Sequence, residues 1–301
     1  MSSKNNKTII MSPTLSIILP AKNEAASLQS LLPKLREYAG EAEIIVVDDG
    51  STDNTVEICQ QNQVKVISHP YSIGNGGAIK SGARAAKGET LLFMDADGQH
   101  KPEDIPRLLA KLGEKYDMVV GARDRASQAG AHRAVANGFY NHLSSWMVGQ
   151  KIHDLTSGFR AVNAKKFRKF LYLLPNTFSY PTTITMSFFR AGYAIAYVPI
   201  EAPKRIGKSH VHVIKDGFRF LLIIIKIGTL YSPQKLFLPI SLSFFTTGLA
   251  YYLYTFITTH RFTNMSALMF ISAILTFLIG IVSEQVSALH YKDSDNEPSG
   301  Q

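Results

Sequence analysis

The chain has 301 residues, enough for one large domain or two small ones, and its 32 Lys and Arg against 23 Asp and Glu give a formal net charge of +9. This basic balance indicates an anionic partner: a nucleic acid, a lipid surface or a phosphorylated small molecule. The single cysteine, Cys59, excludes a disulfide within the chain. Hydrophobic residues make up 46% of the sequence, which is unusual for so basic a protein unless they are concentrated in one region.

After a polar, flexible N-terminus at residues 1–13, which lacks the apolar stretch of a signal peptide, apolar runs alternate with segments of helical spacing. The apolar runs, unbroken as in strands buried on both faces, cover residues 15–21, 43–47, 64–68, 90–94 and 118–120. The helical segments cover residues 25–38, 54–61, 77–86 and 103–112. This alternation predicts an α/β domain over residues 14–208 with a mostly parallel, doubly wound sheet. Its later part holds a helix at 131–148, a strand at 193–200 and a basic loop at 204–208.

Polar clusters follow the first, second and fourth predicted strands. They are PAKNE at 20–24, DDGSTD at 48–53 and DADGQ at 95–99. In a parallel sheet, ligands bind beyond the carboxyl ends of the strands, where the following loops converge. We therefore expect the three clusters to share one edge of the sheet and to form one site.

Asp95 and Asp97 are two residues apart at the end of the fourth predicted strand, where alternate side chains of an extended chain point the same way. Such a pair can hold Mg²⁺ or Mn²⁺, hard cations that prefer oxygen ligands. Gly98 allows a tight turn, after which Gln99 can add or orient an amide oxygen. The alternative is a solvated acidic turn, but the shared edge favours the metal site. His100 either contacts the ligand or begins the next helix.

Asp48 and Asp49 end the second predicted strand and can accept hydrogen bonds from a nucleotide base or a ribose hydroxyl. The alternative is helix capping, with Ser51 or Thr52 as the N-cap, and both interpretations can hold together. The glycine-rich run at 74–77 has neither the lysine and hydroxyl pair of a P-loop nor a place in the first βα unit. It predicts a tight turn with close backbone approach.

Residues 236–259 and 262–283 contain no formally charged side chain, and each run exceeds the roughly 20 residues that a helix needs to cross a bilayer. Only His260 and Arg261 separate them. We expect a transmembrane hairpin over residues 235–286, and the alternative is a helical pair buried in a soluble core. Seven lysines and arginines between residues 204 and 235, against one arginine in the turn, place the soluble part in the cytoplasm.

Five basic residues before the hairpin fall on one helical stripe, because their spacings are near-multiples of 3.6: Lys208, His212, Lys215, Arg219 and Lys226. This pattern predicts an amphipathic helix in the membrane interface over residues 209–234. The alternative is an ordinary amphipathic helix docked on the globular domain. The polar tail at 287–301 is expected to be disordered.

Six motifs occur in the order typical of family-2, GT-A-fold glycosyltransferases: LPAKNEAASL, VVDDGSTDNT, GNGGAIKSGARAAKGE, FMDADGQH, DLTSGFRA and RIGKSH. More narrowly, the chain resembles the polyprenyl-phosphate glycosyltransferases, the dolichol-phosphate mannose synthase-like group with a C-terminal membrane hairpin. The resemblance covers residues 15–208 by motif and the two membrane runs by architecture. It implies a GT-A nucleotide-diphospho-sugar transferase fold followed by a two-helix transmembrane hairpin.

The resemblance also implies roles for individual residues. The nucleotide-binding set comprises Pro20, Ala21, Asn23, Glu24, Asp48, Asp49 and Asp95. The metal and diphosphate motif, with Mg²⁺ or Mn²⁺ as the cofactor, comprises Asp95, Asp97 and Gln99. The basic residues around the donor or lipid phosphates are Arg123, Arg133, Arg160, Arg205 and Lys208. The residues expected to be catalytic are Asp97, Arg123, Arg133 and Arg205.

The implied reaction moves a hexose-type sugar from a UDP- or GDP-sugar to a polyprenyl phosphate at the cytoplasmic face of a membrane. The membrane that we expect is the bacterial inner membrane. A lipid phosphate is already an anion, so no separate general base is expected. We expect a nucleotide sugar, the lipid and the membrane as partners, expect no nucleic acid, and leave a homo-oligomer open. One alternative is another lipid or a polysaccharide acceptor, although a QxxRW-type motif is absent. Another is a non-catalytic nucleotide-sugar sensor, which would not need an intact metal motif.

The sequence departs from the family pattern at two places. Residues 177–193 contain no acidic side chain, although family members often carry one there, so Thr182 and Thr183 are candidates for contacts to the sugar. His210 stands where a lysine is common. The first departure bears on the identity of the donor sugar and not on the type of reaction.

Overall fold

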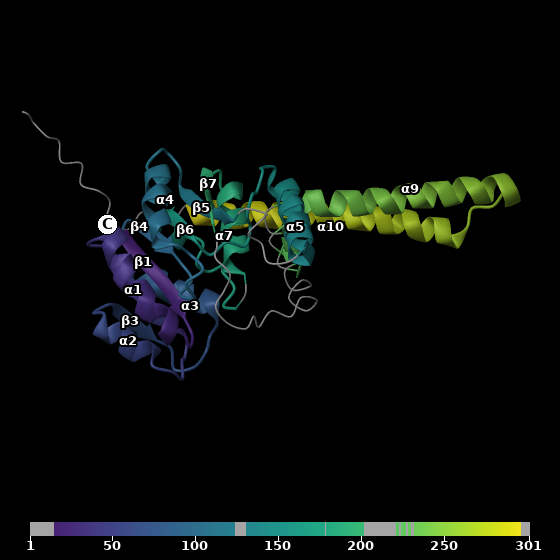
Figure 1. Cartoon of the computed structure of the whole chain (residues 1–301). Helices are drawn as coiled ribbons and strands as arrows, with labels where there is room; N and C mark the ends of the chain where they lie inside the picture. The colour runs from purple at the N-terminus through teal and green to yellow at the C-terminus, as the bar shows by residue number, and fades with distance from the viewer. Residues whose placement is uncertain are drawn as a thin grey trace, which may run out of the picture. The chain divides into compact units, whose positions relative to one another are not determined.

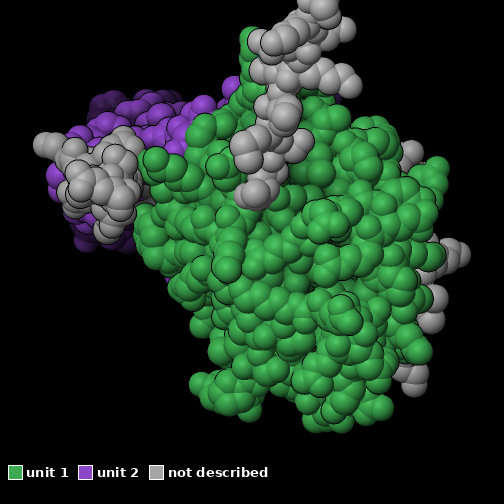
Figure 2. All heavy atoms as spheres, turned by 90° about the vertical axis from the view of Figure 1, so that its left-hand side faces the viewer, with its two compact units in different colours: residues 1–127, 157–180, 194–208 green, residues 128–156, 181–193, 209–301 purple. Residues whose placement is uncertain are grey.

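The computed structural model describes residues 15–123, 131–177, 179–201, 221–222, 224–226, 228–229 and 232–295, without the side chains of residues 131–137 and 290–295 (Figure 1). The chain divides into two compact units (Figure 2). Unit 1 comprises residues 1–127, 157–180 and 194–208, and unit 2 comprises residues 128–156, 181–193 and 209–301. The expected domain over residues 14–208 is therefore shared between the units, since two of its segments belong with the C-terminal helices.

Unit 1 is built on a seven-stranded sheet with the strand order β3-β2-β1-β4-β6-β5-β7. The strands are β1 (Leu15–Ala21), β2 (Glu43–Asp48), β3 (Lys65–Ser68), β4 (Thr90–Phe93), β5 (Met118–Arg123), β6 (Arg160–Asn163) and β7 (Ile195–Ile200). Neighbouring strands are parallel except for β6, which is antiparallel to β4 and β5. The mostly parallel α/β sheet is confirmed. Strand β6 was not predicted, because its sequence, RAVN, has only two apolar residues between an arginine and an asparagine and so forms no apolar run.

Alternate side chains of the central strands pack on opposite sides of the sheet. Ile17 and Leu19 of β1 belong to a core that they share with α1, α2 and α4, including Cys59. Ile18 faces α3, where a Cβ at Gly82 would lie 2.4 Å from the Ile18 Cγ2 atom. The helices of unit 1 are α1 (Ala25–Ala39), α2 (Thr55–Gln61), α3 (Asn75–Ala85), the 3₁₀ helix η1 (Pro102–Asp104), α4 (Ile105–Leu112) and α6 (Ala164–Arg168). Burial on both faces explains why the strand sequences are apolar without alternation.

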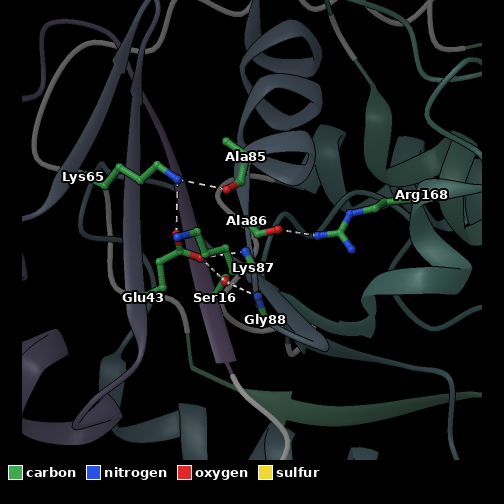
Figure 3. A network of polar contacts seen from close by, with 8 residues as sticks. All are labelled: Ser16, Glu43, Lys65, Ala85, Ala86, Lys87, Gly88 and Arg168. Atoms are coloured by element: carbon green, nitrogen blue, oxygen red, sulfur yellow. Dashed lines mark hydrogen bonds and ion pairs between the residues drawn. The ribbon is translucent and has the colours of Figure 1, made fainter. Parts of the chain in front are cut away.

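A polar network fastens the C-terminal end of α3 to the amino ends of β1 and β2 (Figure 3). Glu43 accepts hydrogen bonds from Ser16 Oγ at 2.6 Å, from the Lys87 amide at 2.8 Å and from Lys65 Nζ at 3.2 Å. Lys65 and Arg168 also donate to backbone carbonyls at the end of α3. Burial alone would raise the pKa of Glu43, but these hydrogen bonds hold the pKa below its usual value. This end of α3 is therefore fixed at the sheet edge opposite the predicted site.

The glycine-rich start of α3 lies against the backbone of residues 175–177. The amide of Gly76 donates to the Thr177 carbonyl at 3.1 Å, and the amide of Gly77 donates to the Asn176 carbonyl at 2.7 Å. A Cβ at Gly76 would lie 1.9 Å from the Pro175 carbonyl oxygen, so only glycine fits there. The predicted tight turn with close backbone approach is confirmed, and these two amides bond to protein carbonyls.

Unit 2 contains α5 (Ala131–Val148), most of α7 (Tyr180–Arg190), and a hairpin of α9 (Pro233–Thr259) and α10 (Asn264–Asp295). Both hairpin helices are long and apolar enough to cross a membrane, over Pro233–Thr259 in α9 and Asn264–Leu289 in α10. Ser241 Oγ donates to the Ala273 carbonyl at 2.8 Å, which joins the two helices. Lys235 Nζ donates to the Trp146 and Met147 carbonyls at 3.1 and 3.2 Å, which fastens the C-terminal end of α5 to the start of α9.

The segments on either side of the hairpin were predicted to be a disordered tail and an interfacial helix. Helix α10 continues to Asp295, so most of the predicted disordered tail at 287–301 is helical. Neither glycine nor proline occurs in the tail before Pro298, so nothing in its sequence ends the helix earlier. Most of the predicted interfacial helix at 209–234 lies outside the described residues, and its described part between 221 and 229 is helical.

We expect Gly76→Ala to destabilise unit 1 by about 2 kcal/mol or more, because the added methyl group must displace the Pro175 carbonyl. Thermal unfolding of the purified protein in detergent measures the effect as a lower apparent Tm. Gly113→Ala is the matched control, since a Cβ there would make an ordinary contact at 3.4 Å. Equal Tm values for the two variants would contradict the close approach.

Candidate functional site

A pocket of about 410 Å³ opens in unit 1 beyond the carboxyl ends of β1, β2 and β4. These neighbouring strands run parallel, so the loops that follow them meet at one edge of the sheet. Six predicted site residues line the pocket: Pro20, Ala21, Glu24, Asp49, Asp95 and Asp97. The lining also includes Lys22, Ser72, Gly74, Asn75, Ala78 and Ala96. The expectation that the three polar clusters share one edge is confirmed.

Two members of the predicted nucleotide-binding set hold the loops together and do not line the pocket. Asn23 has a left-handed φ of 56°, which asparagine tolerates, and its Oδ1 accepts a hydrogen bond from the Thr52 amide at 2.7 Å. Its own amide donates to Ser51 Oγ at 2.9 Å. Asp48 is buried, and its Oδ1 accepts from the Ser51 amide at 3.0 Å. The N-cap of helix α2 is Asn54, so the alternative that Ser51 or Thr52 caps this helix is wrong.

Asp49 is 5% exposed and accepts four hydrogen bonds from the segment after β3. Its Oδ1 atom lies 2.7 Å from His69 Nδ1 and 2.8 Å from the Ile73 amide. Its Oδ2 atom lies 2.7 Å from Ser72 Oγ and 2.8 Å from the Gly74 amide. Burial alone would raise the pKa of Asp49, but these bonds hold the pKa below its usual value. A carboxylate has about four lone-pair sites, so these four hydrogen bonds occupy the accepting capacity of Asp49. Asp49 therefore shapes the pocket wall.

Asp95 and Asp97 both line the pocket, and a turn at residues 96–98 brings them there, since β4 already ends at Phe93. The turn, and not the alternation of an extended strand, therefore places the two carboxylates. Gly98 has a φ of 73°, which glycine adopts without strain. The backbone amide of Gln99 donates to Asp97 Oδ1 at 3.1 Å. Gln99 itself does not line the pocket.

The side chains at this turn fit a hard divalent cation. Asp95 is 36% exposed at its side chain, and it shares the pocket with Asp97. Mg²⁺ is typically held by one or two carboxylates, and waters or substrate phosphates complete its coordination. Among the described residues, no group of three or more His, Cys, Asp or Glu side chains is placed to hold a metal ion. The carboxylate pair therefore suits a cation shared with a phosphate-bearing ligand.

Arg160 does not lie where a phosphate-binding residue was expected. Its side chain is 0% exposed, and its guanidinium donates to the Ser157 carbonyl and lies 5.6 Å from the centre of the Tyr180 ring. Arg160 belongs to β6, inside the sheet between β4 and β5, which explains its burial. Arg160 therefore stabilises the interior of unit 1 and does not line the pocket.

Among the other predicted basic residues, Arg123 alone has a side chain in the part of the chain that the structure describes. Arg123 ends β5, is partly buried and pairs in register with Ile200 of β7. Thr182 and Thr183, the candidate sugar contacts, are 0% and 2% exposed. The side chains of the remaining basic residues, Arg133, Arg205 and Lys208, lie outside the described part of the chain. The backbone of Arg133 belongs to α5.

Sequence reasoning missed the residues that come from the third strand and its loop. His69 contacts Asp49 through Nδ1 and lies 2.9 Å from Ser81 Oγ through Nε2, so it joins the pocket wall to α3. Ser72 both lines the pocket and donates to Asp49. His69 follows β3 directly, so applying the strand-end rule to the third strand would have found this segment.

Comparison with known proteins gives a family for most of unit 1 and for the hairpin. The model of "Glycosyl transferase family 2" matches residues 16–171, and the model of "GtrB C-terminal hairpin" matches residues 232–289. Glucosyl-3-phosphoglycerate synthase from Mycobacterium tuberculosis has a similar fold, with a TM-score of 0.60 and 20% identity over 72% of this chain and 80% of the synthase. This likeness confirms the GT-A-like architecture.

Two relatives illustrate the similarity in sequence. The chain is 32% identical to an undecaprenyl-phosphate mannosyltransferase of Micrococcus luteus, over 64% of this chain and 85% of the relative. It is also 32% identical to an undecaprenyl-phosphate 4-deoxy-4-formamido-L-arabinose transferase of Proteus mirabilis, over 55% of this chain and only 56% of that protein. With its two apolar helices and the hairpin match, the chain is a membrane protein. It belongs to glycosyl transferase family 2 and combines a GT-A fold with a C-terminal hairpin of the GtrB type.

Proposed function

We propose that the protein transfers a hexose-type sugar from a UDP- or GDP-sugar to a polyprenyl phosphate at the cytoplasmic face of a membrane, the bacterial inner membrane. One observation carries the proposal: Asp95, Asp97 and the loop at 20–24 converge on one pocket, in a family-2 chain that also has a GtrB-type hairpin. The names of the Micrococcus and Proteus relatives, both undecaprenyl-phosphate transferases, support a polyprenyl phosphate as the acceptor.

The pocket suits the nucleoside diphosphate part of the donor. The Mycobacterium tuberculosis synthase has been crystallised with Mn²⁺ and UDP, which supports a divalent cation beside a diphosphate here. Asp95 and Asp97 would hold Mg²⁺ or Mn²⁺, and Gln99 would orient Asp97 through its backbone amide. When bound, the cation supplies positive charge that stabilises the departing diphosphate. Lys22, in the lining, adds a cationic side chain to the same pocket.

The acceptor explains why a general base is not required. A phosphate monoester is an anion near neutral pH, so its oxygen can attack the anomeric carbon without first losing a proton to the protein. The protein must then hold the two reacting atoms together and offset their negative charge. We assign this task to Arg123, Arg133, Arg205 and Lys208, and we assign the hairpin the task of keeping unit 1 at the membrane that contains the lipid.

Purified protein in detergent should convert a short-chain polyprenyl phosphate into a chloroform-soluble labelled product when it receives Mg²⁺ or Mn²⁺ and a suitable radiolabelled nucleotide sugar. The panel should contain UDP- and GDP-linked glucose, mannose and amino sugars, because the sequence does not distinguish among them. Labelled lipid formed with one donor and not with the others identifies the donor. The absence of labelled lipid with every donor would contradict the proposed reaction.

We expect Asp97→Asn to lower kcat by about 100-fold or more, because the amide loses the charge that holds the cation. The rate of labelled-lipid formation measures this loss, with the Tm showing that the variant is folded. The matched control is Glu114→Gln, which removes an exposed carboxylate that pairs with Lys111 away from the pocket. Retained activity in Asp97→Asn would remove Asp97 from the metal site.

We expect Asp49→Asn to lower the free energy of unfolding by about 2 kcal/mol at pH 7, because an amide oxygen accepts fewer of the four hydrogen bonds. Since the folded-state pKa of Asp49 lies below its unfolded-state value, the carboxylate stabilises the fold above the unfolded-state pKa, and this contribution is lost as the pH falls through the folded-state pKa. The Tm difference between wild type and variant should therefore shrink on acidification. A difference that does not change with pH would show that the charge of Asp49 is not responsible.

A further inference from the structure

The SGFR motif at residues 157–160 reaches the metal-binding turn through the sheet. Strands β4 and β6 are antiparallel, with Phe93 paired to Arg160. Continuing this register beyond the end of β4 brings Asp95 opposite Gly158. A Cβ at Gly158 would lie 2.7 Å from Asp95 Oδ2 and 3.0 Å from Asp95 Oδ1, which is closer than non-bonded atoms approach. The backbone at Gly158 is therefore in direct contact with the Asp95 carboxylate.

Buried polar contacts fix the backbone of this motif. Tyr180, 3% exposed, donates its hydroxyl proton to the Gly158 carbonyl at 2.9 Å. Burial raises the pKa of Tyr180, so the hydroxyl keeps the proton that it donates. The buried guanidinium of Arg160 donates to the Ser157 carbonyl and lies over the Tyr180 ring. Two consecutive carbonyls of the motif are thus held by side chains that are themselves closely packed.

Phe159, the third residue of the motif, packs against His100, which follows the turn at residues 96–98. Phe159 is fully buried and stacks on His100, with ring centroids 5.1 Å apart and an interplanar angle of 19°. His100 is 5% exposed, and its Nδ1 accepts a hydrogen bond from the Asp95 amide at 3.3 Å. His100 therefore closes the turn that begins at Asp95 and does not line the pocket.

We propose that the SGFR motif and Tyr180 form a rigid support that positions the Asp95 carboxylate for metal binding. In this assignment Gly158 limits where the carboxylate can lie, and Phe159 holds the Asp95 backbone through His100. Arg160 and Tyr180 keep the Ser157 and Gly158 carbonyls in place. All four are positioning residues and none contacts the cation. The inference rests on the proposed function, because it needs a divalent cation at Asp95 and Asp97. It also gives Arg160 a role in place of the phosphate contact implied by family resemblance.

The test is the affinity of the full-length protein in detergent for Mn²⁺ alone, measured from the electron paramagnetic resonance signal of free Mn²⁺. Gly158→Ala should raise the Kd for Mn²⁺ by about 10-fold to 100-fold, as is usual when the supports of a metal ligand are changed. Tyr180→Phe, which removes one hydrogen bond without adding bulk, should raise it by about 3-fold to 10-fold. The matched control Gly113→Ala adds the same methyl group away from the pocket and should leave the Kd unchanged.

The outcomes separate this inference from the proposed function. If wild type binds Mn²⁺, if Asp97→Asn abolishes binding, and if both Gly158→Ala and Tyr180→Phe bind as tightly as wild type, the support is wrong while the metal site stands. If wild type binds no Mn²⁺, the metal part of the proposed function fails and the inference fails with it. Tyr180→Phe keeps the test valid if Gly158→Ala does not fold. A weakened Kd in Tyr180→Phe at an unchanged Tm is the result that a merely structural role would not produce.

Discussion

The convergence of parallel strand ends at one edge of the sheet is the constraint on which the site depends. Strands β1, β2 and β4 are parallel neighbours, so the polar loops that follow them lie at the same edge of the sheet. Each loop is then fastened to a partner from elsewhere in the sequence. Asn23 bonds the loop after β2, Asp49 bonds the loop after β3, and Asp95 lies against Gly158. The pocket is the space that these pairings leave open.

The carboxylates at this edge fall into two physical classes. Asp48 and Asp49 are buried, and protein donors bond to their oxygens, as a charged group needs when it is removed from water. Asp49 lines the pocket as well, but Asp95 and Asp97 differ from it because they line the pocket and are only partly buried. A cation binds only carboxylate oxygens that it can reach, so Asp95 and Asp97 are the better candidates for metal binding. Asp48 and Asp49 shape the wall around that site.

Local pattern predicted the parts of the fold that depend on one segment at a time. The apolar runs predicted β1, β2 and β4, the absence of charge predicted the hairpin, and the strand-end rule predicted a site that includes Asp95 and Asp97. What could not be predicted depends on pairing between distant segments. Strand β6 has only four residues, and it is a strand because β4 and β5 bond to it. The burial of Arg160 follows from that pairing, so a phosphate-binding role inferred from its motif could not be checked by sequence.

The central claim is that the two carboxylates of the turn after β4 hold a divalent cation beside a nucleoside diphosphate. The most direct measurement is an anomalous difference map from a crystal of the full-length protein grown with Mn²⁺ and a nucleoside diphosphate. We expect a manganese peak in contact with carboxylate oxygens of both Asp95 and Asp97 and with the diphosphate. A bound nucleoside diphosphate with no manganese peak at these carboxylates would contradict the metal site.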